Sequence, residues 1–430
     1  GAETYWSSQL ATNGMSSYAI NANGELFAWG YNSPSYGELG HNNKTTYSSP
    51  VQIPGSNWSK IANMGAAALA TKADGRMYSW GANSFGMLGI GNDTAYSSPK
   101  QIPGTTWGTY IGGGDQIGAA IKTDGTLWMW GNNGDAGQLG QNDRTNRNSP
   151  VQIPGTTWSK VSCTRRSTLA IKTDGTMWSW GDNEYGELGH NDTVMRSSPV
   201  QVASNVTTWK SITTGSAATL ATKTDGTMYG WGQNTNGKCM LNTGDKLSSP
   251  TQVGTDTDWS TTIGARQNFY CIKTNGSLWV AGRNENGKLG LNQAGAHNAF
   301  QLSSPTQLPG TWSTDSRKFR SSNYHNIAIK ANGTLWSWGS NQYGTLGQNS
   351  SGGSGSSADR FSSPVQIGTE TTWNSCIAGY FWSAATKTNG TMWSWGNNTS
   401  GSLGQNSANV QLSSPTQIGT DTTWKEAGGL

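Results

Sequence analysis

The sequence predicts an all-β protein, a β-propeller of eight four-stranded blades in a single domain over residues 1–430, with seven blades as the alternative. Three observations support this fold class: a hairpin motif recurs eight times at steps near 50 residues, each unit supplies four short strands, and helical periodicity is absent. Four-stranded units repeated around an axis form a propeller, which leaves only short, protected strand edges. A linear solenoid is the rival, and the hairpin-plus-two-strand unit favours the propeller.

The repeated hairpin is clearest in the stretch from Lys172 to Gly181, which reads KTDGTMWSWG. Asp-Gly or Asn-Gly between two apolar runs favours a type I′ turn, in which both central residues have positive φ. The turn glycines are Gly24, Gly75, Gly125, Gly175, Gly226, Gly276, Gly333 and Gly390. Most lysines stand once per repeat beside these turns, and we interpret them as solvated turn residues.

The strand after the turn carries two tryptophans two residues apart, such as Trp178 and Trp180. Because side chains alternate along a strand, both rings lie on one face. The second tryptophan recurs in seven repeats, and Ala281 alone breaks the series. We expect this large aromatic residue to pack between neighbouring sheets.

Two further markers complete the unit. A tryptophan opens the first strand, a Gly-rich loop follows the hairpin, and a Ser-Ser-Pro segment begins the fourth strand. Pro199 suits the start of that strand because its missing N–H does least harm there. Longer linkers after Asn292 and Asn349 account for two steps of 57 residues.

Composition excludes several classes of function. Only 12% of the residues are charged and the net charge of +4 is spread evenly, so the chain lacks the basic stripe of a nucleic-acid-binding protein. No run is long and apolar enough for membrane insertion, and no signal peptide is visible. The chain has no initiator Met, which leaves open a processed or partial protein.

The residues that carry enzyme chemistry do not form a recognisable site. The four histidines belong to no Ser-His-Asp, HExxH or GxSxG pattern. His41 and His190 stand where other repeats have glutamine, which indicates a hydrogen-bonding role. The four cysteines replace core-type residues and lack metal-ligand spacing. We therefore predict a protein that is not an enzyme and uses no metal or cofactor.

The eight repeats form an internal alignment, and the tips between the first and second strands vary most. In a propeller these tips gather on one face, and a tip set rich in arginine and aromatics suits a partner-binding face. Its candidate residues are Asp115, Arg165, Arg166, Arg266, Gln267, Tyr324, His325, Tyr380, Phe381 and Trp382. The alternative is that these are ordinary variable loop residues without a role in binding.

The pattern WSWG-x-N-x-x-G-x-LG, followed by SSPVQI and a strand that begins with tryptophan, resembles the RCC1-type repeat over essentially the whole chain. The resemblance implies a propeller, usually of seven blades. The founder of that family is a chromatin-bound exchange factor for a small GTPase. This chain lacks basic tails and any insertion like the exchange-promoting wedge. Its low charge and nearly uniform repeats look more like bacterial and phage members, some of which are secreted or surface binding proteins, including an inhibitor of β-lactamases.

We therefore expect a non-enzymatic structural or binding protein, extracellular or on a virion surface, that contacts protein partners. The alternatives are a secreted protein inhibitor or regulator that acts through one propeller face, and a carbohydrate-binding adhesin. The termini add self-assembly, because GAETYW at the start resembles GTDTTW before the end. Nine copies of the opening tryptophan serve eight hairpins, so one copy closes the ring and the other is available to a neighbouring subunit.

Overall fold

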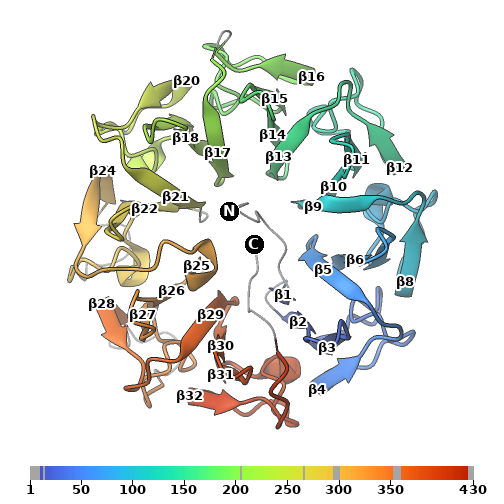
Figure 1. Cartoon of the computed structure of the whole chain (residues 1–430), viewed down its shortest axis with the longest axis vertical. Helices are drawn as coiled ribbons and strands as arrows, with labels where there is room; N and C mark the ends of the chain where they lie inside the picture. The colour runs from blue at the N-terminus through green and yellow to red at the C-terminus, as the bar shows by residue number, and fades with distance from the viewer. Residues whose placement is uncertain are drawn as a thin grey trace.

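The computed structural model describes residues 10–12, 15–203, 206–264, 267–293, 301–351 and 360–424. Its strands form eight four-stranded antiparallel sheets, which stand as blades around a central axis (Figure 1). Chain order runs outward in every blade, so blade 1 extends from β1 to β4 and blade 8 from β29 to β32. The prediction of an all-β propeller with eight blades is confirmed, and the alternative of seven blades is wrong.

The strands have the following bounds, from the axis outward. The first strands are β1 (Leu10–Thr12), β5 (Trp58–Asn63), β9 (Trp107–Gly114), β13 (Trp158–Cys163), β17 (Trp209–Thr214), β21 (Trp259–Gly264), β25 (Phe319–Ser321) and β29 (Trp373–Ala378). The second strands are β2 (Ser16–Ile20), β6 (Ala67–Lys72), β10 (Ile117–Lys122), β14 (Ser167–Lys172), β18 (Ala218–Lys223), β22 (Asn268–Lys273), β26 (His325–Ile329) and β30 (Trp382–Lys387). The third strands are β3 (Leu26–Gly30), β7 (Met77–Gly81), β11 (Leu127–Gly131), β15 (Met177–Gly181), β19 (Met228–Gly232), β23 (Leu278–Arg283), β27 (Leu335–Ser340) and β31 (Met392–Gly396). The fourth strands are β4 (Tyr47–Gln52), β8 (Tyr96–Ile102), β12 (Arg147–Gln152), β16 (Arg196–Gln201), β20 (Leu247–Gln252), β24 (Gln301–Leu308), β28 (Arg360–Gln366) and β32 (Leu412–Gln417).

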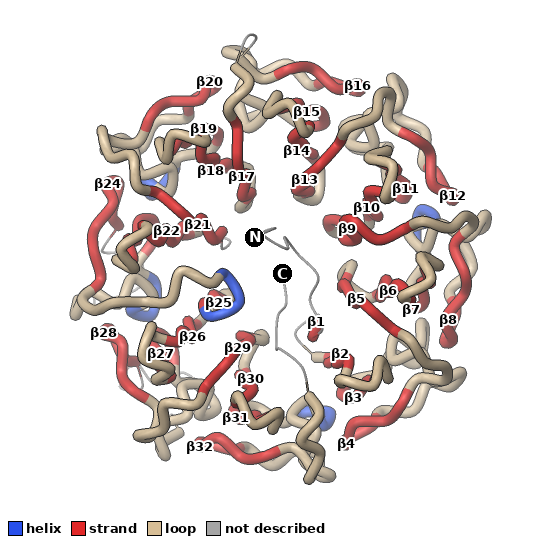
Figure 2. The backbone as a smooth tube through the Cα atoms, in the orientation of Figure 1, coloured by secondary structure: helices blue, strands red, loops and turns tan. Residues whose placement is uncertain are grey.

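The described helices are single 3-10 turns in the connections (Figure 2). They are η1 (Ser84–Gly86), η2 (Thr235–Gly237), η3 (Glu285–Gly287), η4 (Ser316–Lys318) and η5 (Thr399–Gly401). None of the helices in the described ranges has the length and apolar character needed to cross a membrane.

The hairpin between β14 and β15 differs from the predicted type I′ turn. The N–H of Gly175 donates to Lys172 O at 3.0 Å, and Gly175 has a φ of 78° whereas Asp174 is not at positive φ. This matches a three-residue loop, a type I turn followed by a left-handed glycine. The type I′ prediction is wrong because Asp174 Oδ1 accepts the N–H of Thr176 at 2.9 Å, which holds the turn without a left-handed aspartate.

The turn lysines are not simply solvated, which corrects the interpretation from the sequence. Lys172 Nζ lies 4.8 Å from the ring centroid of Trp158 and 4.5 Å from that of Trp178. The first-strand tryptophan and the third-strand aromatic residue thus form a cage for an ammonium group, a favourable cation–π arrangement. The cage recurs in blades 2 to 8, and the side chain of Lys273 in blade 6 is only 9% exposed.

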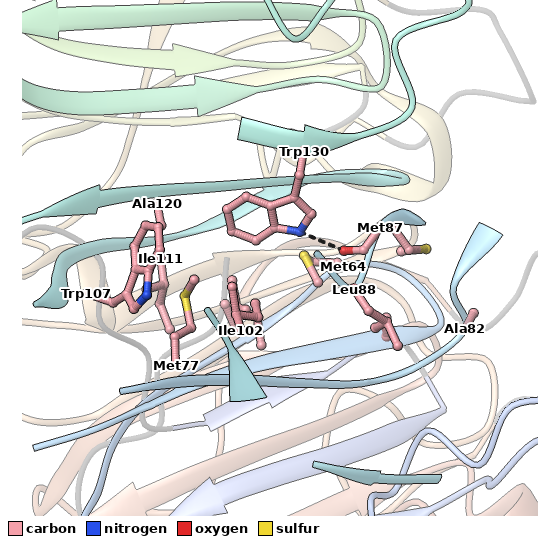
Figure 3. Close-up of a cluster of buried hydrophobic side chains, with 13 residues drawn as sticks. Met64, Met77, Ala82, Met87, Leu88, Ile102, Trp107, Ile111, Ala120 and Trp130 are labelled. Carbon is pink, nitrogen blue, oxygen red and sulfur yellow. Dashed lines mark hydrogen bonds between the residues drawn. The ribbon is translucent and has the colours of Figure 1, made fainter. Parts of the chain in front are cut away.

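The hydrophobic core lies between the blades, in clusters that each combine residues of two consecutive blades. Trp130 of blade 3 is fully buried against blade 2, and its indole N–H donates to Met87 O at 2.9 Å (Figure 3). The corresponding Trp29 of blade 1 donates to Ser402 O of blade 8 at 3.1 Å. The prediction that the repeated tryptophan packs between sheets is therefore confirmed around the ring.

Blade 6 shows why one repeat tolerates the loss of this tryptophan. Small or polar residues stand opposite the tryptophan on the second strand, for example Thr168 opposite Trp180. In blade 6 the fully buried Phe269 stands opposite Ala281. Blade 6 thus carries its large aromatic side chain on the second strand instead of the third, and the interior stays filled, as close packing requires.

Both chain ends contribute to the first-strand position of blade 1. Trp424 pairs with Asn21 as Trp58 pairs with Lys72 in blade 2, and its N–H donates to Gly390 O of blade 8 at 3.1 Å. The rest of that position is filled by β1, which pairs with β2. The C-terminal copy of the opening tryptophan thus joins blade 8 to blade 1, whereas Trp6, the N-terminal copy, lies outside the described residues.

Candidate functional site

The variable segments of each blade meet at one end of the propeller. The tips join the first and second strands, and the Gly-rich loops join the third and fourth strands. Antiparallel order places both at the same end of a blade, opposite the Asp-Gly and Asn-Gly turns. In blade 3 the two segments touch, because Asn132 Nδ2 of the loop donates to Gln116 Oε1 of the tip at 3.2 Å. We call this end the tip face.

Four aromatic side chains of blades 7 and 8 form one cluster on the tip face. The rings of Tyr324 and Phe381 stack, with centroids 4.7 Å apart and an interplanar angle of 19°. Tyr380 packs edge-on against Tyr324 at 5.2 Å and against Phe381 at 5.1 Å. Tyr343, from the Gly-rich loop of blade 7, packs edge-on against Phe381 at 5.2 Å. We call these four residues the aromatic patch.

The aromatic patch is partly open to solvent. Tyr380 is 40% exposed, and Tyr324, Tyr343 and Phe381 are half-buried. Large exposed aromatic rings that already pack against one another lose little side-chain entropy when a partner covers them. The arrangement is therefore suited to bind a protein surface.

Tyr343 takes part in the patch at a conformational cost. Its φ is 67°, in the left-handed region that disfavours bulky side chains by about 1–2 kcal/mol. Asn236 and Asn286 take the same loop position in blades 5 and 6, and asparagine tolerates this conformation. The fold therefore does not require an aromatic residue here, and strained residues of this kind cluster at ligand contacts.

Two of the predicted tip residues are buried, so they are not available to a partner. His325 is fully buried in β26, where its Nε2 lies 2.8 Å from Ser383 Oγ and its Nδ1 lies 3.0 Å from Ser322 Oγ. Burial, together with the positive charge of Lys288, lowers the pKa of His325 to about 3, so the ring is neutral at physiological pH. Trp382 is the first residue of β30 and is 2% exposed. Both residues lie in the interior, at the first position of the strand that follows each tip.

The charged candidates lie on blades 3 and 4, apart from the aromatic patch. Arg165 Nε is 4.0 Å from Asp115 Oδ2, and both side chains are largely exposed. Arg166 lies 3.6 Å from Asp135 and 3.8 Å from Asp182. Exposed pairs of this kind contribute about 0–1 kcal/mol to stability. The two arginines are therefore accessible to solvent, and nearby carboxylates offset their positive charge.

The remaining candidates belong to the tip of blade 6. Gln267 is half-buried, and its Oε1 accepts a hydrogen bond from Arg283 Nη1 at 3.0 Å. Arg266 lies outside the described residues. The structure therefore separates the nine described candidates into an aromatic group on blades 7 and 8, a charged group on blades 3 and 4, two buried residues, and Gln267 at the tip of blade 6.

Sequence reasoning missed Tyr343, because it considered variation only at the tips. The residue before the glycine of the Gly-rich loop varies as widely across the repeats. It is Tyr36, Phe85, Ala136, Tyr185, Asn236, Asn286, Tyr343 or Ser400 in blades 1 to 8. Comparison of that position across repeats could have identified Tyr343 as a candidate.

The histidines outside the tips hold the Gly-rich loops. His190 Nε2 lies 2.9 Å from Ser179 Oγ, and Gln405 Nε2 makes the equivalent bond to Ser394 Oγ at 3.0 Å. The predicted hydrogen-bonding role of this position is confirmed for His190. Within the ranges that the structure describes, no group of three or more His, Cys, Asp or Glu residues is placed to hold a metal ion.

Comparisons with known proteins agree with this architecture. Residues 109–367, more than half of the chain, match the model of the RCC1-like domain, and residues 23–67 and 74–121 match that of the regulator of chromosome condensation (RCC1) repeat. The ultraviolet-B receptor UVR8 of Arabidopsis thaliana is 28% identical over 238 residues, 53% of each chain. The E3 ubiquitin-protein ligase HERC2 of Mus musculus is 28% identical over 257 residues, 56% of this chain and 5% of HERC2. The chain thus spans about half the length of UVR8 and a small part of HERC2.

Solved structures show the same fold. Prp20p of Saccharomyces cerevisiae superposes with a TM-score of 0.60 at 20% identity, covering 83% of this chain and 88% of its own. Human WBSCR16 superposes with a TM-score of 0.59 at 20% identity, covering 81% and 94%. Together with the repeat pattern and the eight blades built from it, the match over residues 109–367 shows that this chain belongs to the RCC1-like domain family.

Proposed function

We propose that this protein is a non-enzymatic binding protein whose aromatic patch holds a protein partner on the tip face of blades 7 and 8. The observation that carries the proposal is the contact of four partly exposed aromatic rings from two blades. Tyrosine is enriched among the few residues that supply most of the binding energy in interfaces. The structure of Prp20p has been described with its binding properties to Gsp1p and histones, and yeast RCC1 (Prp20) has been solved bound to Kap60.

The test removes the exposed rings and spares the buried support. A photo-reactive phenylalanine analogue at position 380 captures the partner from native material. We then expect the combined change Tyr324→Ser, Tyr380→Ser and Phe381→Ser to weaken binding at least about thirtyfold, the effect of one hot-spot residue of about 2 kcal/mol. The affinity is measured by calorimetry with the purified partner.

The matched control lies on another sector of the same face. Arg165→Ser combined with Arg166→Ser in blade 4 should leave the affinity within about threefold, because these arginines pair with carboxylates of blades 3 and 4, away from the aromatic patch of blades 7 and 8. Unchanged binding by the aromatic variant, or equal losses in both variants, would contradict the assignment to the aromatic patch.

Self-assembly is a second candidate function, and the composition of blade 1 favours it. Trp424 fills the opening position of blade 1, and the other seven blades contain their own opening tryptophans. The sequence nevertheless carries a ninth copy at Trp6. We propose that the two terminal copies exchange between chains, so that the C-terminal copy of one chain enters blade 1 of the next.

Light scattering at rising protein concentration tests this exchange. The wild-type chain should show a mass that increases with concentration, whereas Trp424→Ala should stay monomeric, because it has no C-terminal tryptophan to place in blade 1 of another chain. A wild-type mass equal to the monomer up to about millimolar concentration would rule out the exchange, since linked sites commonly reach that effective concentration.

An extracellular or virion-surface location is the setting we propose for such a binding protein. It is supported by the surface chemistry, because only 12% of the residues are charged and Ser, Thr, Asn and Gly dominate the loops. Immunogold labelling of native material would show label on particles or cell surfaces, and label confined to the cell interior would contradict it.

A further inference from the structure

A second candidate site lies where the loops of blades 1, 2 and 3 meet, away from the aromatic patch. These loops line a cavity of about 370 Å³ that is open to solvent. Small-molecule sites in proteins measure about 300–1,000 Å³, so the cavity is large enough for one sugar ring or a small disaccharide. The residues that decide its chemistry are Tyr36, Asn83, Phe85, Asp93, Asn146 and Asn148.

Two exposed aromatic rings line this cavity. Tyr36 is 38% exposed and Phe85 is 44% exposed. They occupy the equivalent position before the loop glycine in consecutive blades, so the repeat places them next to each other around the ring. No other pair of consecutive blades has aromatic residues at this position, since Tyr185 and Tyr343 are flanked by alanine, asparagine or serine.

Phe85 keeps its ring in a backbone conformation that suits other residues better. Its φ is 61° and its ψ is 18°, in the left-handed region, where Asn286 has a φ of 59° at the equivalent position. Phenylalanine is disfavoured there and asparagine is tolerated. Because the ring is exposed, the fold gains little from it, and a gain in binding is the physical reason that fits its presence.

The polar part of the lining is neutral apart from one carboxylate. Asn83 is buried and rigid, because its Nδ2 donates to Asn92 O and Thr94 O at 2.8 Å and its Oδ1 accepts from Leu88 N. Asp93, Asn146 and Asn148 line the same cavity and are exposed. Asn146 Oδ1 accepts the N–H groups of Asn133 and Gly134, so its NH₂ group is the part suited to donate to a ligand.

We propose that this cavity binds the pyranose ring of a neutral saccharide. The C–H face of a sugar carries partial positive charge and packs on the negative face of an aromatic ring, here Phe85 or Tyr36. Sugar hydroxyls both donate and accept, which matches the carboxylate of Asp93 and the amides of Asn146 and Asn148. The site is separate from the aromatic patch, so this proposal stands independently of the protein partner.

Two other ligand classes fit the cavity less well. An anion would meet Asp93, and no lysine or arginine lines the cavity to balance its charge. An ammonium ion would use Asp93 and the rings but would leave the exposed amide NH₂ groups to water, whereas a sugar uses both the donors and the acceptors of the lining. The chain binds its own ammonium groups differently, between two aromatic rings such as Trp158 and Trp178.

Saturation-transfer NMR with free cellobiose, maltose, lactose and N,N′-diacetylchitobiose tests the proposal. We expect at least one disaccharide to bind. Phe85→Asn should weaken that binding about tenfold or more, and Tyr36→Ser should weaken it in the same direction. Phe85→Asn keeps the loop folded, because asparagine is native at this position in blades 5 and 6. The same disaccharide linked to albumin then tests whether the site also binds the end of a protein-attached glycan.

The control is Tyr185→Asn, which also replaces an aromatic residue by asparagine at the equivalent loop position, in blade 4, and should leave sugar binding unchanged. Three results would overturn the proposal: none of the four disaccharides binds, binding survives both Phe85→Asn and Tyr36→Ser, or trimethyllysine binds more tightly than every sugar. Loss of sugar binding in Phe85→Asn with partner binding intact would show that the two sites are distinct.

Discussion

Replacement of Trp180 by alanine is expected to lower the free energy of unfolding by about 3–5 kcal/mol. Trp180 is fully buried between blades 3 and 4, its ring lies 6.2 Å from that of Trp158, and its indole N–H donates to Gln138 O at 2.9 Å. The change removes this packing and leaves the buried Gln138 carbonyl without that bond. Guanidinium unfolding followed by circular dichroism measures the loss.

Blade 6 supplies the control for this prediction. Ala281→Trp alone should destabilise the protein, because the interior already holds Phe269. Phe269→Thr alone should also destabilise it, by leaving a cavity. The double variant restores the pairing found in blade 4, so the two changes should couple favourably by about 0.5–3 kcal/mol. If the losses of the two single variants simply add in the double variant, residues 269 and 281 do not share one space in the interior.

Trp424→Ala is expected to have a comparable effect, a loss of about 3–5 kcal/mol, because it breaks the ring at its closure. Trp424 is 6% exposed and packs against Phe27 with ring centroids 5.2 Å apart. Its backbone also links the turn of blade 8 to blade 1. Thermal and guanidinium unfolding of the monomer give the magnitude.

Two matched variants serve as controls for Trp424→Ala. Trp58→Ala removes the equivalent residue of blade 2 and should cost a similar amount. Trp6→Ala should change the free energy of unfolding by less than about 1 kcal/mol, because Trp424 fills the opening position of blade 1. A large loss in Trp6→Ala together with a small loss in Trp424→Ala would assign closure to the N-terminal copy instead.

Most of the fold could be predicted because the same sequence signals occur in all eight repeats. The turn glycines and the third-strand tryptophans identify each hairpin, and a four-stranded unit of this length can bury its apolar faces only against neighbouring copies. The type I′ turn was the local error. It depended on whether Asp174 takes a left-handed conformation or accepts the Thr176 N–H, and the hydrogen bond prevails. The lysine cages also escaped prediction, because they require Trp158 to lie beside Trp178 across the blade.

The binding face was predicted only in outline. Tyr324 and His325 are adjacent in sequence, yet Tyr324 stacks on Phe381 and His325 is fully buried. The difference arises from where β26 begins, since one residue decides whether a side chain belongs to the tip or to the interior. The same boundary separates Phe381 from Trp382. The limit of a strand cannot be read from sequence to within one residue.

By itself the sequence favoured eight blades over seven and identified the hairpin of each blade and the tryptophan between blades, because copies placed around one axis can each bury that third-strand tryptophan against the next copy. Only the tertiary structure decided which variable residues meet. Tyr343 and Phe381 come from different blades, as do Tyr36 and Phe85. Whether the members of each pair lie close together depends on the conformation of the loops relative to the next blade. Closure of blade 1 by Trp424 was decided in the same way, since the two terminal copies of the motif are alike in sequence and only the structure pairs Trp424 with Asn21.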